Sequence, residues 1–120
     1  MTAVPSILLI DDSEHVVEAR GEVLVMKGYR VAIARDGQQA LDYLRTHLLP
    51  SLILLDIVMP RMDGWEFLTQ RARQERLSSI PVVITFAAET NERMNVAAIV
   101  RKPWNIEDLL KVIKEHTVEN

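Results

Sequence analysis

The sequence contains no cysteine, few aromatic residues and no long apolar run. Without cysteine the chain cannot form a disulfide, a thiolate zinc site or a cysteine nucleophile. No run approaches the roughly 20 apolar residues needed to cross a membrane. Residues 1–6 also lack the charged start of a signal peptide. We therefore expect a cytoplasmic protein that makes no membrane contact.

Positive charge is also scarce, with 14 Lys and Arg against 17 Asp and Glu and a formal net charge of −3. Binding to nucleic acid depends on basic side chains that neutralise phosphates, so no direct nucleic-acid contact is expected. His15, His47 and His116 lie far apart without the spacing of metal ligands, and we expect them at the surface. The 120 residues, 48% of them hydrophobic, suit a single domain over residues 1–120.

Five short apolar runs predict buried β-strands. They cover residues 7–10, 29–34, 52–55, 82–86 and 97–100. Apolar residues at helical spacing lie between most of these runs and after the last. The four expected helices carry the sets Val16, Ala19, Val23 and Met26; Ala40, Leu41, Leu44 and Leu48; Trp65, Leu68 and Ala72; and Ile106, Leu109, Leu110 and Ile113. The polar stretch 89–95 has room for only a shortened helix.

This alternation predicts an α/β fold, a doubly wound, five-stranded parallel sheet with helices on both faces. In such sheets ligands bind beyond the carboxyl ends of the strands. Asp11 and Asp12 follow the first run, and Asp56 follows the third. Each aspartate alone could simply cap a helix or lie in solvent. Together they would repel one another unless a cation neutralised them, and an all-oxygen set of ligands favours Mg²⁺. Lys102, after the fifth run, would add one positive charge.

Three sequence blocks give the chain a family resemblance. They are ILLIDDS at 7–13, LLDIVMPRMDG at 54–64, and Lys102-Pro103. They resemble the signature blocks of response-regulator receiver domains, and the resemblance extends over the whole chain. The middle block is the specific one, because Asp-Asp or Lys-Pro alone is common. The resemblance implies the flavodoxin-like strand order 2-1-3-4-5.

The resemblance also implies roles for individual residues. Asp56 would accept a phosphoryl group from a histidine kinase or a histidine phosphotransfer protein. Asp12, Asp56 and the Val58 backbone carbonyl would bind Mg²⁺, with Asp11 acting largely through water, and Lys102 would pair with phosphoryl oxygens. The domain would catalyse only its own phosphorylation and dephosphorylation, and would not otherwise be an enzyme.

The chain departs from this family at the residue that reports phosphorylation, a Thr or Ser at the end of the fourth strand. Counting from Pro81 puts Phe86 there, whereas the nearest hydroxyl is that of Thr85. We interpret Thr85 as the switch. The aromatic residue expected three positions before Lys102 is replaced by Ile99. These departures leave an alternative function, a pseudo-receiver that acts as a phosphorylation-independent protein-interaction module.

Two further expectations concern output and lifetime. The face formed by residues 89–95, the fifth strand and the last helix would contact a second copy or a downstream protein, in altered form because 89–95 is short. Val58, and Ala87 or Ala88, stand two residues beyond the phosphoacceptor and the switch position, respectively. None can orient an attacking water, which predicts slow hydrolysis of an aspartyl phosphate.

Overall fold

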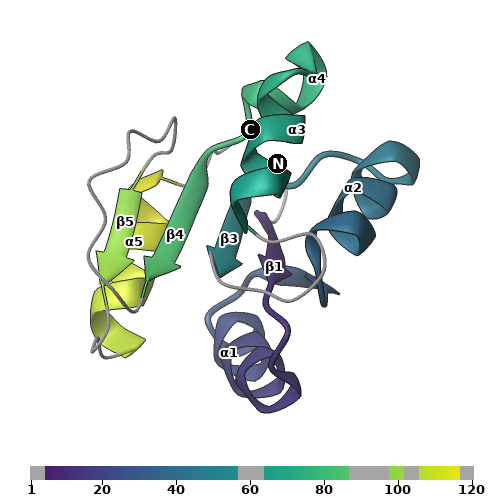
Figure 1. The fold of residues 1–120 in the computed structure, drawn as a ribbon. Coiled ribbons are helices and arrows are strands. Elements are labelled where there is room, and N and C mark those ends of the chain that lie inside the picture. The colour runs from purple at the N-terminus through teal and green to yellow at the C-terminus, as the bar shows by residue number, and fades with distance from the viewer. Residues whose placement is uncertain (1–4, 57–63, 87–97, 102–105, 117–120) are drawn as a thin grey trace.

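The structure, a computed structural model, describes residues 5–56, 64–86, 98–101 and 106–116. Its strands form one parallel five-stranded sheet in the order β2-β1-β3-β4-β5 (Figure 1). The strands are β1 (Ser6–Ile10), β2 (Arg30–Ala34), β3 (Leu52–Asp56), β4 (Val82–Phe86) and β5 (Ala98–Arg101). The predicted strand order is confirmed. The fifth strand begins one residue later than predicted and continues through Arg101.

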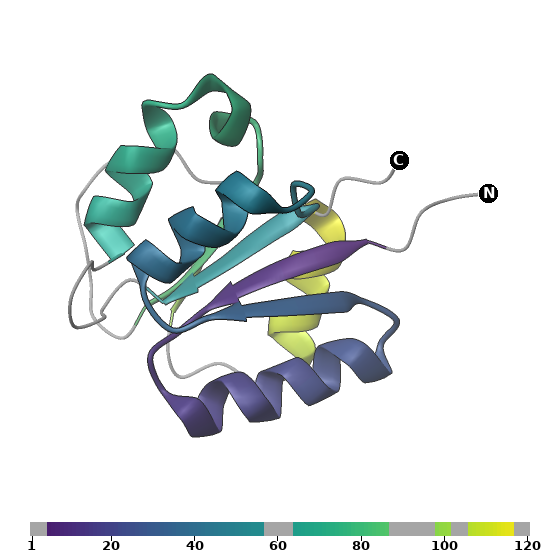
Figure 2. The same cartoon turned by 90° about the vertical axis from the view of Figure 1, so that its right-hand side faces the viewer.

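The helices are α1 (Glu14–Met26), α2 (Gly37–Thr46), α3 (Gly64–Ala72), α4 (Glu75–Ser78) and α5 (Ile106–His116). Figure 2 shows α1 and α5 on one face of the sheet and α2 and α3 on the other. Each face has its own hydrophobic core. Val17, Leu24 and Ile113 pack with Leu9 and Leu54 on the α1–α5 face. The fold is therefore doubly wound, as predicted.

The predicted buried face of α1 is wrong by about one residue. Val17, Gly21 and Leu24 are buried, whereas Ala19 is exposed and Met26 is 83% exposed. The apolar residues of α1 surround the helix, so their spacing does not define a single face. Packing decides the matter: Gly21 faces β2, where a β-carbon would lie in ordinary van der Waals contact, 3.8 Å from Cδ1 of Ile33.

The second predicted helix ends earlier than its apolar pattern suggested. Asp36 caps its start, accepting the Gln39 N–H at 2.8 Å. The helix ends at Thr46, His47 is extended, and Leu48 is 92% exposed instead of belonging to the buried face. Arg76 of α4 donates to the carbonyl of Leu44 at 2.8 Å. This bond satisfies a carbonyl at the end of α2 that has no partner within the helix.

The short helix α4 between α3 and β4 was not predicted. Arg71 of α3 is almost fully buried beneath this segment and donates to the carbonyls of Ser78 and Ile80 at 3.0 and 2.6 Å. Desolvation by burial lowers the pKa of Arg71 from its usual value.

The shortened helix predicted at 89–95 lies outside the described residues, as does that part of the predicted output face. No helix within the described ranges is both long and apolar enough to cross a membrane.

Candidate functional site

The predicted acidic residues meet at the carboxyl ends of neighbouring strands. Ile10 of β1 pairs with Leu55 of β3, so the next step along both chains brings Asp11 level with Asp56. The Asp11 N–H donates to the carbonyl oxygen of Ala34 at 3.1 Å, and this bond continues the β1–β2 ladder past the end of β1. In the same way Asp56 pairs with Thr85 of β4. Positions 11, 56 and 85 thus lie at one level across three adjacent strands.

Asp11 has a buried side chain whose two oxygens are both occupied. Only 2% of the residue is exposed. Its Oδ1 accepts the Ser13 N–H at 3.0 Å, and its Oδ2 accepts a bond from Nη1 of Arg20 at 3.4 Å. Arg20, from the middle of α1, is itself only 8% exposed. Asp11 is therefore held by a turn on one side and a buried guanidinium on the other.

Asp12 is exposed and is positioned through its backbone. Nη2 of Arg35 donates to the Asp12 carbonyl at 3.1 Å. Arg35 directly follows β2, and its own N–H donates to the Gln39 side chain at 2.9 Å. Ser13 then caps α1 by accepting the Val16 N–H. The loop from β1 to α1 is thus fixed at both aspartates, while the Asp12 carboxylate stays accessible.

The two arginines beside this loop were missed by sequence analysis. Arg20 lies within a predicted helix but outside the face that was expected to be buried, so the sequence pattern gave no reason to select it. Arg35 follows the second apolar run directly, a position equivalent to that of Asp11 after the first run. The end of the strand was therefore the signal that could have identified Arg35. No comparable signal marks Arg20.

The remaining predicted site residues are only partly placed. Asp56 and Thr85 are located by their strands, and their side chains lie outside what the structure describes. Val58 and Lys102 also lie outside the described residues, as do Ala87 and Ala88. Phe86 pairs with Arg101 of β5, one step beyond the level of Asp56. The register therefore separates the two candidate switch positions by one residue.

The chemistry of Asp11 and Asp12 fits a magnesium site. Both supply carboxylate oxygens, which Mg²⁺ prefers, and Mg²⁺ commonly keeps waters while using one or two carboxylates. The occupied oxygens of Asp11 suit contact through water, and the exposed carboxylate of Asp12 suits direct contact. The side chains that the structure describes include no cluster of three Asp, Glu, His or Cys residues able to hold a metal. Asp56, the third predicted ligand, lies outside that set.

The histidines occur apart from this site. His15 and His47 are exposed, and the ring of His47 stacks on Tyr43 with 4.0 Å between centroids. Nδ1 of the half-buried His116 lies 2.9 Å from the carbonyl oxygen of Val112. Among the described residues, no group of three metal-ligating side chains includes a histidine.

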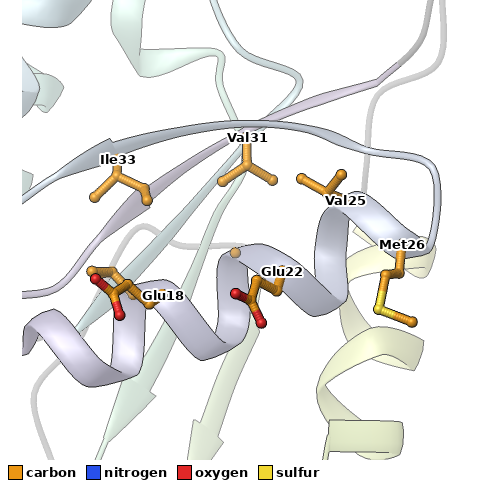
Figure 3. A pocket seen from close by; sticks show the side chains of 8 residues that line it. Glu18, Glu22, Val25, Met26, Val31 and Ile33 are labelled. Carbon is orange, nitrogen blue, oxygen red and sulfur yellow. The ribbon is translucent and has the colours of Figure 1, made fainter.

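A separate apolar groove runs between α1 and the edge strand β2 (Figure 3). Val25, Met26, Val31 and Ile33 line it, and Glu18 and Glu22 stand along α1. In the sheet order, β2 is two strands away from β3, which carries Asp56. Neither Asp11 nor Asp12 is among the residues that line the groove, which is therefore distinct from the acidic site.

Comparison with known proteins identifies the family. The family model described as the response regulator receiver domain matches residues 7–114. The chain belongs to this family. The receiver domain is 34% identical to a probable methanogenesis regulatory protein, FilR2 of Methanothrix harundinacea, with 91% of the chain and 79% of FilR2 aligned. It is also 34% identical to the response regulator Rre1 of Synechocystis, of which it spans 50%.

The structural comparison agrees. The receiver domain superposes on the chemotaxis protein CheY4 of Vibrio cholerae with a TM-score of 0.86 and 27% identity, covering 95% of this chain and 99% of CheY4. The receiver domain spans about half the length of several curated relatives, including Rre1 and the transcriptional regulator DltR of Streptococcus agalactiae. It is thus a signalling domain of two-component systems, with its acidic residues at the carboxyl edge of the sheet.

Proposed function

We propose that this receiver domain accepts a phosphoryl group on Asp56 from a histidine kinase or a histidine phosphotransfer protein, in a reaction that requires Mg²⁺. The modification then alters its interactions with a second copy or a downstream protein. A kinase of this kind uses cytoplasmic ATP, so we expect the domain to act in the cytoplasm. Two core layers around one sheet support a single domain over residues 1–120.

The observation that carries the proposal is the shared level of Asp11, Asp56 and Thr85 across three adjacent strands. Neighbouring strands lie about 4.8 Å apart, so these positions are close enough to act on one small group. The site also lies where doubly wound sheets bind their ligands. Membership of the receiver family supports the same assignment for Asp56.

The proposed reaction is a displacement at phosphorus. A carboxylate oxygen of Asp56 attacks the phosphorus of a phosphohistidine, and the new O–P bond forms as the P–N bond breaks. The released electron pair returns to the imidazole, which regains neutrality or takes a proton from solvent. Bound Mg²⁺ would offset charge on the transferring group, as in other phosphoryl transfers.

The chain's own residues would do the rest. Asp12, Asp56 and the Val58 carbonyl would hold the metal, with Asp11 acting through water. Lys102 would pair with a phosphoryl oxygen. The turn at Ser13 and the bond from Arg35 to the Asp12 carbonyl keep this loop in place before the partner arrives. Such preorganisation lowers the cost of aligning the reacting groups.

Intact-mass spectrometry tests this function. The protein is incubated with a small-molecule phosphodonor such as acetyl phosphate, with and without MgCl₂. We expect the mass to rise by one phosphoryl group only when both are present. No gain under any condition would contradict the proposal and favour the pseudo-receiver, an interaction module independent of phosphorylation.

Thr85 is our proposed switch residue. It is the register partner of Asp56, whereas Phe86 lies one step further along β4. Strand positions alternate between faces, so position 85 shares a face with Val83 and position 56 with Leu54, and both of those residues lie in one core.

We expect Thr85→Ala to accept the phosphoryl group but to lose most of the change in amide hydrogen exchange that phosphorylation causes. Phe86→Leu is the control and should keep that change; the reverse pattern would assign the switch to position 86.

The phosphorylated state should be long-lived. Val58, Ala87 and Ala88 offer no polar side chain to orient a water for attack on the aspartyl phosphate. We expect the isolated phosphorylated protein to lose its phosphoryl group over many minutes or longer in a mass time course, and Val58→Asn to shorten this lifetime. Complete loss within seconds in the wild type would refute this explanation.

A further inference from the structure

Arg20 is a buried cation at a position where its charge acts on the acidic site. Its Nη1 lies 3.4 Å from Oδ2 of Asp11, and the two residues are only 8% and 2% exposed. The guanidinium comes from the middle of α1, among buried neighbours such as Val17 and Leu24. Burial of an arginine is costly unless an anion compensates it. The structure therefore places a positive charge of the chain itself beside Asp11.

This arrangement bears on metal binding. Both oxygens of Asp11 already accept hydrogen bonds, one of them from a full positive charge. A second guanidinium, that of Arg35, holds the Asp12 carbonyl. An incoming Mg²⁺ would thus meet an aspartate pair whose negative charge is partly offset, and the positive charge of Arg20 would repel it.

We propose that Arg20 is a resident counter-cation, a positioning residue that stabilises Asp11 in the metal-free protein and weakens the affinity of the site for Mg²⁺. This inference rests on the proposed function, because it assumes that Asp11 and Asp12 serve a magnesium site. It adds a consequence for regulation. The receiver domain stays folded and ready without metal, and the cation concentration sets how much of it is competent.

Arg20→Gln is the most informative variant. Glutamine can still donate a hydrogen bond toward Asp11, but it removes the positive charge. We expect calorimetric titration with MgCl₂, at fixed pH and ionic strength, to show roughly tenfold tighter binding than in the wild type. That is roughly the effect given by Coulomb's law for charges of +1 and +2 about 8 Å apart when the metal lies at the exposed carboxylate of Asp12 and is screened almost as in bulk water.

Thermal unfolding supplies the second measurement. Without Mg²⁺, Arg20→Gln should unfold at a lower temperature than the wild type, because Asp11 then lies buried without its counter-charge. Added MgCl₂ should raise the midpoint more in the variant than in the wild type, because tighter ligand binding gives greater stabilisation. If the variant is unfolded without metal, it should refold as MgCl₂ is added.

Two control variants separate charge at the site from other effects. Arg20→Lys keeps a positive charge on the same helix and should retain affinity close to that of the wild type. Arg30→Gln removes an exposed arginine at the first residue of β2, the end of that strand remote from the site. It should leave the affinity for Mg²⁺ unchanged. A gain in Arg30→Gln as large as that in Arg20→Gln would show a general charge effect and overturn the proposal.

The outcomes distinguish this inference from the function on which it rests. If the wild type binds Mg²⁺ and Arg20→Gln binds no more tightly, or fails to refold with MgCl₂, the role of Arg20 is refuted while the magnesium site stands. If neither protein binds Mg²⁺, the site itself is refuted and the inference falls with it. Binding by the variant where the wild type shows none would support the proposal strongly.

Discussion

Asp56→Asn should abolish phosphoryl uptake from both a small-molecule donor and a partner kinase. The amide lacks the negative charge and the nucleophilic oxygen that the displacement needs, so we expect a loss of at least about a hundredfold, consistent with the removal of a covalent nucleophile. Intact mass measured after incubation with the donor and MgCl₂ reports the effect. The fold should persist, since the change is nearly isosteric.

Asp42→Asn is the matched control for this prediction. Asp42 is an exposed aspartate on α2, where it accepts bonds from Gln38 and Arg45. The same chemical change there should leave phosphoryl uptake unaltered. Uptake that persisted in Asp56→Asn, or that disappeared equally in both variants, would place the acceptor elsewhere or indicate a general defect.

Leu54→Ala should destabilise the domain by about 3 kcal/mol, within the range measured for leucine truncation in protein cores. Leu54 is fully buried on β3, the central strand of the sheet, where it packs with Leu9 and Val83. Its removal leaves a cavity that neighbouring strands cannot readily fill. Urea denaturation, followed by circular dichroism, measures the change in the free energy of unfolding.

Leu48→Ala is the corresponding control, since Leu48 is 92% exposed after the end of α2. We expect this change to alter the free energy of unfolding by less than about 0.5 kcal/mol. The comparison also checks the correction to the predicted helix. A loss at Leu48 similar to that at Leu54 would mean that the apolar pattern, not the structure, gave the right burial.

The sheet could be predicted because its strands are buried on both faces. Such strands read as short, continuous apolar runs, and the runs at 7–10 and 52–55 each stop at an aspartate. The same pattern placed Asp11 and Asp56 at the carboxyl edge, and the observed register brings them to one level. The acidic pair was therefore predictable from the positions at which the two apolar runs end.

Helix faces were harder to predict, because their burial depends on packing that the local sequence does not encode. In α1 the adjacent pairs Val16-Val17 and Leu24-Val25 give two possible apolar faces. The structure buries the face that carries Val17, Gly21 and Leu24, and Arg20 is buried with them. An arginine on a buried face breaks the amphipathic rule, so the pattern favoured the wrong choice. Arg20 was therefore missed for the same reason that the buried face of α1 was predicted wrongly.

The position of the phosphoryl group is the most direct test of the account. After phosphorylation, borohydride reduction converts an aspartyl phosphate to homoserine, and tandem mass spectrometry of the resulting peptides locates it. We predict homoserine at position 56, formed only when MgCl₂ and the phosphodonor were both present. Homoserine at another aspartate, or at none in protein shown to be folded, would contradict the assignment of this receiver domain as a phosphoacceptor through Asp56.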